Sequence, residues 1–283
     1  MKHILLILIF AIVPIKAQCI IRYDSLTVAS DSFLIMYEDT LSVLMEQLHD
    51  SKNTSEKNQI NHLITQHLKQ VFTDTLSFFY PFERLAKLGK IYSPDSMLRI
   101  YTWNIAYARG TYGYAGAIQQ LDIAGGSYAV FMLTHNHEII LNSDTIYPSE
   151  QWYGALYYDI LLTKCAEKKL YTLLGVNFNN LFTSRKIIDV LDFSSSGQPV
   201  FGKPIFFSKG QLTQRIIFEY SARVTMSLKY NQKMNMIVFD HLSPSQSKYT
   251  GKYEFYGPDF SYDGYRYANC RWIFEEDIDA RNR

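Results

Sequence analysis

The stretch RIIFEYSARVTMSLKY, residues 215–230, decides the fold class of this chain. Apolar side chains occupy its even-numbered positions, and polar side chains such as Arg215 and Glu219 stand between most of them. Alternation with a period of two is typical of a β-strand with one buried face and one wet face. A continuous strand of this length would span about 50 Å, longer than the usual strand of about 3–10 residues. We therefore expect a bend or bulge at 221–223, or a strand that passes between two sheets.

Strand signals continue on both sides of this stretch. Asn231-Gln232 predicts a turn into further apolar positions, so 215–240 is expected to form a long hairpin. Gly125-Gly126 predicts the turn of a second hairpin, and 164–168 that of a third. The pattern indicates a mainly antiparallel β domain over 91–283, a sandwich or a partly open barrel, with a propeller-like arrangement as the alternative. The other predicted strands are 98–103, 118–124, 128–133, 152–163, 169–175, 185–193, 199–207, 252–256 and 265–274.

The chain before residue 90 carries helical patterns instead. Apolar residues recur every three or four positions over 31–48 and again over 60–71. Thr54 or Ser55 can cap the second helix. We expect 18–90 to form a helical N-terminal region whose apolar stripes cover the sheet. Together with the β domain, this predicts an α+β fold.

An apolar run, ILLILIFAIV at 4–13, follows two basic residues at the N-terminus. As a helix it would reach about 15 Å, half of a bilayer core of about 30 Å. The run therefore predicts a secretion signal that is removed after Ala17. Cys19 leaves a lipoprotein open, although Gln18 is larger than the residue that lipidation favours before the cysteine. We expect a periplasmic or secreted protein with no transmembrane segment once the signal is removed.

The composition limits the classes of partner and the chemistry. Hydrophobic residues make up 47% of the chain and charged residues 19%, which indicates a packed globule. The net charge of +1 predicts no sequence-independent attraction to nucleic acid. Cys165 and Cys270 could form a disulfide, or could equally remain two buried thiols. The 22 Tyr and 18 Phe favour strands and a face that touches a partner.

Five segments of the chain resemble an uncharacterised group of exported, β-rich bacterial proteins. These segments are YSPDSMLRIYTWN at 92–104, YTLLG at 171–175, RKIIDVL at 185–191, MIVFDHL at 236–242 and GPDFSYDG at 257–264. The chain departs from the group at Ser96, where a Gly is expected, and at Asn104, where an Asp is expected. The resemblance extends over 76–282. It implies a shared β-rich fold and a periplasmic or surface location, and it transfers no activity and no catalytic residue.

Two histidines lie close together in the segment THNHE at 134–138. His135 and His137 are two positions apart, which places both on one face of a strand. Imidazole nitrogens are preferred zinc ligands, so this pair is the candidate metal site. A third ligand would be needed, and Glu138 faces the other way. A pair of histidines at a polar strand end is the plainer interpretation.

A carboxylate and an imidazole are adjacent at Asp240-His241, after an apolar strand. They are candidates for general-base catalysis, or a distant donor to the histidine pair. Neighbouring residues of a strand face opposite sides, so these two cannot pair simply, and a plain strand end explains them as well.

In the turn 257–264, the carboxylates of Asp259 and Asp263 would suit calcium, or simply form the turn.

The tract 101–114 concentrates aromatic side chains around glycines. A flexible aromatic loop could stack on sugar rings or on a peptide. Core packing beside a mobile loop explains the tract equally well. The candidate ligand-binding residues are Trp103, Tyr107, Tyr112 and Tyr114.

Two classes of function remain. The chain has no phosphate-binding glycine loop, nucleophile elbow, zinc-protease helix motif or paired-cysteine metal motif, and we predict no cofactor. We expect a non-catalytic, exported or envelope-associated protein that binds an unknown protein or glycan partner. The alternative is a metal-assisted hydrolase. An enzyme would gather His135, His137 and His241 in one pocket, whereas a binding protein would leave them apart and present an aromatic face.

Overall fold

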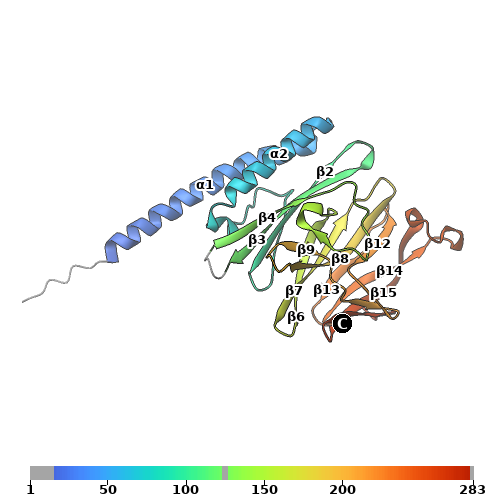
Figure 1. Ribbon diagram of the computed structural model, residues 1–283. Coiled ribbons are helices and arrows are strands. Elements are labelled where there is room, and N and C mark those ends of the chain that lie inside the picture. The colour runs from blue at the N-terminus through green and yellow to red at the C-terminus, as the bar shows by residue number, and fades with distance from the viewer. Residues whose placement is uncertain (1–15, 123–126, 281–283) are drawn as a thin grey trace, which may run out of the picture.

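The computed structural model describes the backbone of residues 16–122 and 127–280, and the side chains of 31–121 and 128–280. Within these ranges, two α-helices and three sheets stack as four layers (Figure 1). One apolar cluster fills each interface: helices against the first sheet, first sheet against second, and second against third. The strands are antiparallel apart from one parallel pair, so the predicted α+β fold is confirmed. The sheets stack face to face as in a sandwich, and not around an axis as in a propeller.

The helical layer consists of α1, Lys16–Asp50, and α2, Thr54–Val71. The side chain of Asn53, one residue before the predicted Thr54, caps α2 by accepting a hydrogen bond from the Glu56 N–H. The predicted apolar stripes face the first sheet. No α-helix in the described part of the chain has the length and apolar composition to span a membrane. Residues 1–15 of the predicted signal, 1–17, lie outside the described residues, and Lys16 and Ala17 are the first residues of α1.

The first sheet lies beneath the helices in the order β1-β2-β3-β4. Its strands are β1, Gly89–Tyr92; β2, Leu98–Ala106; β3, Tyr112–Asp122; and β4, Ser127–Thr134. Side chains alternate between its faces, so Trp103 packs on the helices while Ile100 packs on the second sheet. The predicted hairpin of β3 and β4 is present, and its Gly125-Gly126 turn lies outside the described residues.

The second sheet is buried on both faces, because another sheet covers each side. Leu173 and Ile187 face the first sheet, while Leu174 and Ile188 face the third. The expectation of one wet face is therefore wrong for this central sheet. The predicted hairpin around 164–168 is confirmed. The strands are β5, Tyr147–Pro148; β6, Leu156–Cys165; β7, Lys168–Asn177; β8, Thr183–Phe193; β9, Pro199–Phe201; and β12, Ile216–Ser221, which pairs with β8.

The third sheet has the order β11-β10-β16-β15-β14-β13. Its strands are β10, Phe206–Ser208; β11, Gln211–Thr213; β13, Leu228–Asn231; β14, Met236–Pro244; β15, Tyr256–Ala268; and β16, Arg271–Glu275. The short 3₁₀ helices are η1, Thr75–Phe78; η2, Ala108–Gly110; η3, Ser149–Gln151; η4, Ser247–Tyr249; and η5, Tyr253–Phe255.

The stretch 215–230 passes between two sheets, as one of the sequence-based alternatives expected. β12 ends at Ser221 in the second sheet, and the chain enters the third sheet as β13 at Leu228. The single long hairpin over 215–240 is therefore wrong, and only β13 and β14 form one. Arg215, expected on a wet face, is fully buried because its charge pairs with Asp189 inside the protein.

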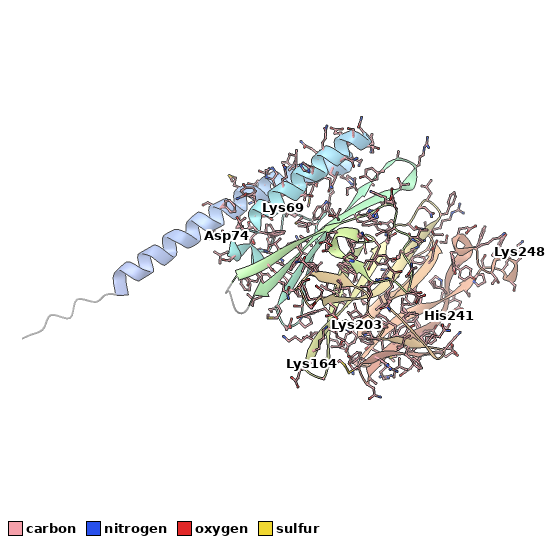
Figure 2. The ribbon with its side chains drawn as sticks, in the orientation of Figure 1. Lys69, Asp74, Lys164, Lys203, His241 and Lys248 are labelled. Carbon is pink, nitrogen blue, oxygen red and sulfur yellow. A yellow bond between two sulfur atoms is a disulfide. The ribbon has the colours of Figure 1, made fainter. Side chains whose placement is uncertain are left out.

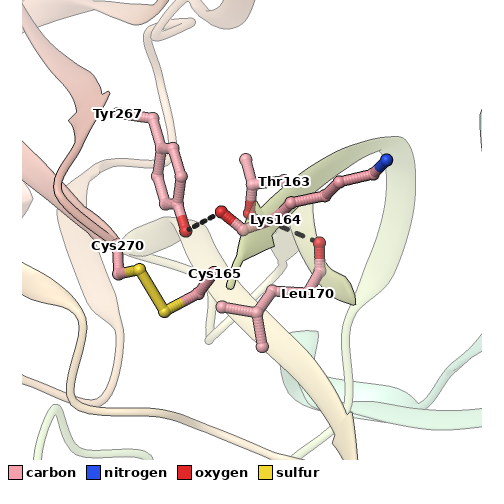
Figure 3. Close-up of a disulfide and its surroundings, with 6 residues drawn as sticks. All are labelled: Thr163, Lys164, Cys165, Leu170, Tyr267 and Cys270. Carbon is pink, nitrogen blue, oxygen red and sulfur yellow. Dashed lines mark hydrogen bonds between the residues drawn. A yellow bond between two sulfur atoms is a disulfide. The ribbon is translucent and has the colours of Figure 1, made fainter. Parts of the chain in front are cut away.

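Three predicted strands are interrupted or replaced by other structure. Residues 252–256 form mostly the 3₁₀ turn η5, and 199–207 divide into β9 and β10. A tight turn at Asn269 and Cys270, both with positive φ, interrupts 265–274 and separates β15 from β16. Cys270 pairs with Cys165, so the disulfide joins the end of β6 to this turn (Figure 3).

Candidate functional site

A cleft of about 370 Å³ lies between α2 and the first sheet. One wall is α2, and the floor and the other wall come from β2, β3 and the end of β4. The polar side chains that line it are Asn58, Asn61, His62, Thr65, Lys69, Tyr107, Thr134, His135 and His137. The cleft therefore gathers several of the predicted site residues with helix residues that belong to no sequence motif.

The helix wall follows from the pattern of α2. Ile60, Ile64 and Leu68 point into the core of the helical layer. Asn58, Asn61, His62, Thr65 and Lys69 recur at spacings of three and four beside this stripe, so they share the neighbouring face. One amphipathic helix thus anchors itself with its apolar stripe and presents a polar stripe to the cleft.

Two asparagines on this stripe are held in defined orientations by aromatic donors. The Tyr107 hydroxyl donates to Asn58 Oδ1 at 2.6 Å, and Trp103 Nε1–H donates to Asn61 Oδ1 at 2.7 Å. Each bond uses one of the two lone pairs of the amide oxygen and leaves the NH₂ group available as a donor. Both asparagines therefore line the cleft with an NH₂ group that can donate to a ligand.

The histidine pair adds further donors at the strand end. The rings of His135 and His137 have centroids 4.2 Å apart. The backbone N–H of Tyr114 donates to His135 Nδ1 at 3.2 Å, so the proton of the neutral ring is on Nε2. The pKa of His135 is lowered to about 4, mainly by burial and to a smaller extent by the nearby His137. At neutral pH His135 is therefore an uncharged ring that offers an Nε2–H donor.

The floor of the cleft depends on small residues of β3. A Cβ at Gly113 would lie 2.9 Å from the ring of Tyr107, and a Cβ at Gly116 would lie 2.6 Å from the carbonyl oxygen of Tyr101. Gly113 therefore lets the Tyr107 ring lie against β3 on its way to Asn58. Among the described residues, the lining includes Lys69 and no carboxylate, so Lys69 gives the cleft a positive charge, and the asparagines and the neutral His135 add uncharged donors.

The aromatic tract divides between the two faces of the first sheet. Trp103 and Tyr107 face the helices, whereas Tyr112 and Tyr114 face the second sheet. Trp103 and Tyr114 are buried, and the Tyr114 hydroxyl accepts a hydrogen bond from the Phe178 N–H at 2.6 Å. These four residues therefore belong to β2, β3 and their connection, and do not form one exposed aromatic surface.

The second predicted pair, Asp240 and His241, lies on β14 in the third sheet, at the other side of the molecule from Lys69 (Figure 2). Asp240 accepts a hydrogen bond from the Ser227 N–H at 2.7 Å and does not contact His241. His241 Nδ1 lies 2.8 Å from Asp263 Oδ2, and its Nε2 lies 3.9 Å from Asp259 Oδ2. The hydrogen bond to Asp263, opposed by burial and aided by nearby carboxylates, raises the pKa of His241.

The structure thus separates the histidines that a common metal site would require. His135 and His137 lie together at the cleft, and His241 lies with Asp263 in another layer. In the described residues, no group of three or more His, Cys, Asp or Glu side chains is arranged to hold a metal ion.

Sequence reasoning missed the α2 residues of the cleft. Asn58, Asn61 and Lys69 carry no motif, and their only signal is a polar stripe beside the apolar one. That signal shows which helix face is polar, and it cannot show that the face borders a cleft. No family model, curated protein or solved structure matches this chain.

Proposed function

We propose that this chain is an exported, non-catalytic binding protein that holds an anionic group, a carboxylate or a sulfate, in the cleft between α2 and the first sheet. The observation that carries the proposal is the orientation of Asn58, Asn61 and His135. In each, a protein donor already binds the acceptor atom, and an N–H group remains available to a ligand. Several converging donors and a nearby Lys69 favour an anion.

Binding is favoured over catalysis by the state of His135. A general base needs an available lone pair and a pKa near the working pH. The Nδ1 lone pair of His135 accepts the Tyr114 N–H, and burial holds the pKa of the ring at about 4. His135 is therefore suited to donating a hydrogen bond and poorly suited to accepting a proton.

Export is supported by the disulfide between Cys165 and Cys270. Disulfides persist in oxidising compartments such as the bacterial periplasm and are rare in the cytosol. The apolar run at 4–13 agrees with the same route. A periplasmic or secreted location would also give the cleft access to charged groups of the envelope or of an extracellular glycan.

The proposal is tested by calorimetric titration of the full mature chain with sulfate and with glucuronate, using uncharged glucose as the comparison. We expect both anions to bind and glucose not to bind at this cleft. Asn58→Asp keeps the oxygen that accepts from Tyr107 and replaces the donor with a negative charge, so anion affinity should fall at least about tenfold. Lys69→Gln should weaken binding, while Lys248→Gln, which changes an exposed lysine of η4 on the other side of the molecule from Lys69 (Figure 2), should not. Equal affinity in Asn58→Asp and the unaltered chain would refute the proposal.

Metal-assisted hydrolysis is the second candidate, and it rests on the 4.2 Å separation of the His135 and His137 rings. A metal-bound histidine usually donates its other ring N–H to an acceptor. His135 Nδ1 instead accepts from a backbone donor, which leaves its proton on Nε2. Titration with zinc chloride separates the two candidates: tight zinc binding that is lost in His137→Gln would favour the hydrolase.

A further inference from the structure

A second cavity lies two layers away from the cleft, where β6 meets two hairpins of the third sheet. Its volume is about 570 Å³, within the range of about 300–1,000 Å³ that is usual for small-molecule sites. One side comes from residues 159–163 of β6, and the other from the β13–β14 and β15–β16 hairpins. We call it the β6 groove. The side chains that carry the argument are Asp159, Tyr230, Gln232, Asn235, Tyr267 and Trp272.

Three aromatic rings line the β6 groove. Trp272 is almost fully buried, and its ring lies edge to face with that of Tyr267 at 5.1 Å. Tyr230 and Tyr267 are half-buried, so part of each ring reaches the surface. The two tyrosine rings provide apolar contact area, while their hydroxyl groups form hydrogen bonds to other parts of the protein.

The polar groups of the β6 groove offer both acceptors and donors. The Tyr230 hydroxyl donates to Asn235 Oδ1 at 2.6 Å, which leaves the Asn235 NH₂ group as a donor. Asp159 Oδ1 accepts from the Ile160 N–H at 2.9 Å, and the other carboxylate oxygen has no hydrogen-bond partner among the described residues. Burial raises the pKa of Asp159, and the hydrogen bond from the Ile160 N–H opposes this shift. No cationic side chain lines the groove among the described residues.

We propose that the β6 groove binds a neutral oligosaccharide. A sugar ring has an apolar C–H face, which Tyr230 and Tyr267 can cover, and an edge of hydroxyl groups. Each hydroxyl both donates and accepts, which matches the carboxylate of Asp159 and the amides of Gln232 and Asn235. An organic cation would also suit aromatic rings with a carboxylate, but it cannot use amide donors. The size and the mixed donors and acceptors therefore favour the sugar.

The groove is held in shape before any ligand arrives. The Cys165–Cys270 disulfide joins the end of β6 to the β15–β16 turn, and the Tyr267 hydroxyl donates to the Lys164 carbonyl oxygen at 3.2 Å (Figure 3). Both links connect the two sides of the groove. A site whose walls are already fixed loses less conformational entropy on binding. This inference does not depend on the anion cleft, because the two sites share no lining residue.

The experiment is saturation-transfer NMR on the mature chain with a panel of hexasaccharides: cellohexaose, chitohexaose, maltohexaose, xylohexaose and mannohexaose. Choline and spermidine are included as organic cations. We expect at least one hexasaccharide to bind with a Kd below about 10 mM. Asp159→Asn and Tyr230→Ala should each weaken that binding at least about tenfold. Tyr253→Ala removes an exposed tyrosine from η5, outside the groove, and should leave binding unchanged.

Thermal denaturation of each variant shows whether it folds, and only folded variants are compared. Trp272 is left intact because it belongs to the core. Three results would overturn the proposal: no hexasaccharide binds, the cations bind and the sugars do not, or Asp159→Asn and Tyr230→Ala both bind as the unaltered chain does. Sulfate binding at the cleft is measured on the same samples, so a failure here is distinct from a failure of the proposed function.

Discussion

At the scale of single residues, the buried pair of Arg215 and Asp189 fixes the loop that follows the histidines. Both side chains are fully buried, and Arg215 Nε lies 3.0 Å from Asp189 Oδ2. The guanidinium also donates to the carbonyl oxygens of Asn142, Thr145 and Phe201. The Tyr153 hydroxyl donates to the same Asp189 oxygen at 2.6 Å. One charge pair thus satisfies loop carbonyls that the core would otherwise leave without donors.

Asp189→Asn should destabilise the protein by about 3–5 kcal/mol, because it leaves the buried Arg215 charge without a counter-ion. Urea denaturation measures the free energy of unfolding. Asp144→Asn changes an exposed aspartate in the adjoining loop and serves as the control, with an expected effect within about 0.5 kcal/mol. A loss of less than about 1 kcal/mol in Asp189→Asn would contradict this role for the pair.

His135 should make stability depend on pH. The pKa of its ring is about 4 in the folded protein and 6.5 as the ordinary value, so the unfolded chain binds more protons between these limits. The contribution of the neutral His135 ring to the free energy of unfolding is complete above pH 6.5 and is lost as the pH falls toward 4. His137, His62 and Lys69 are the other titratable side chains that border the cleft.

The free energy of unfolding should therefore decrease more steeply between pH 6.5 and 4 in the unaltered chain than in His135→Gln. Urea denaturation at several pH values gives the two curves. His49→Gln, at the end of α1, is the matched histidine control and should follow the unaltered chain. Parallel curves for His135→Gln and the unaltered chain would show that His135 is not held neutral by burial.

Alternation in the sequence shows which residues share a face of a strand. Whether that face is buried or wet depends on what packs against it. The pattern of 215–230 correctly placed Tyr220 and Leu228 in the core. It placed Arg215 in water, since the compensating carboxylate of Asp189 is on a strand that pairs with β12 and is distant in sequence. Similarly, nothing near Asn58 in the sequence indicates that Tyr107 will occupy its amide oxygen.

At the scale of elements, the segment between β12 and β13 carries the chain from the second sheet to the third, and the disulfide links the same two sheets a second time. β12 pairs with β8, and β13 pairs with β14 in the next layer. The length of the alternating run exceeds that of a usual strand, which left this passage and a bend or bulge at 221–223 as the two predicted alternatives. The turn at Asn269 and Cys270 was missed, since neither is a glycine and only the disulfide partner accounts for a cysteine there.

Replacing both cysteines, Cys165→Ser with Cys270→Ser, should lower the free energy of unfolding by about 2–5 kcal/mol. The two residues are separated by 105 positions, so the cross-link closes a large loop and lowers the conformational entropy of the unfolded chain. Urea denaturation of the double variant against the oxidised chain measures the loss. The reduced unaltered chain is the control and should match the double variant. A change below about 1 kcal/mol would mean that the packing of β6 on the β15–β16 hairpin holds without the link.

At the scale of the whole molecule, the four layers place the two proposed sites at different interfaces. The anion cleft lies where the helices meet the first sheet, and the β6 groove lies where the second sheet meets the third. The sequence predicted helices followed by antiparallel strands, but not the order of the layers. Periodicity marks which residues share a face and carries no information about which sheet covers it.

The central claim is that converging donors at the cleft bind an anion, and crystals grown with sodium selenate test it most directly. Selenium gives an anomalous signal that locates the oxyanion without assumptions about the density. We predict an anomalous peak in the cleft, with selenate oxygens within hydrogen-bond distance of Asn58 Nδ2, Asn61 Nδ2 and His135 Nε2. An empty cleft at saturating selenate, or a cation bound by His135 Nε2 in its place, would contradict the account.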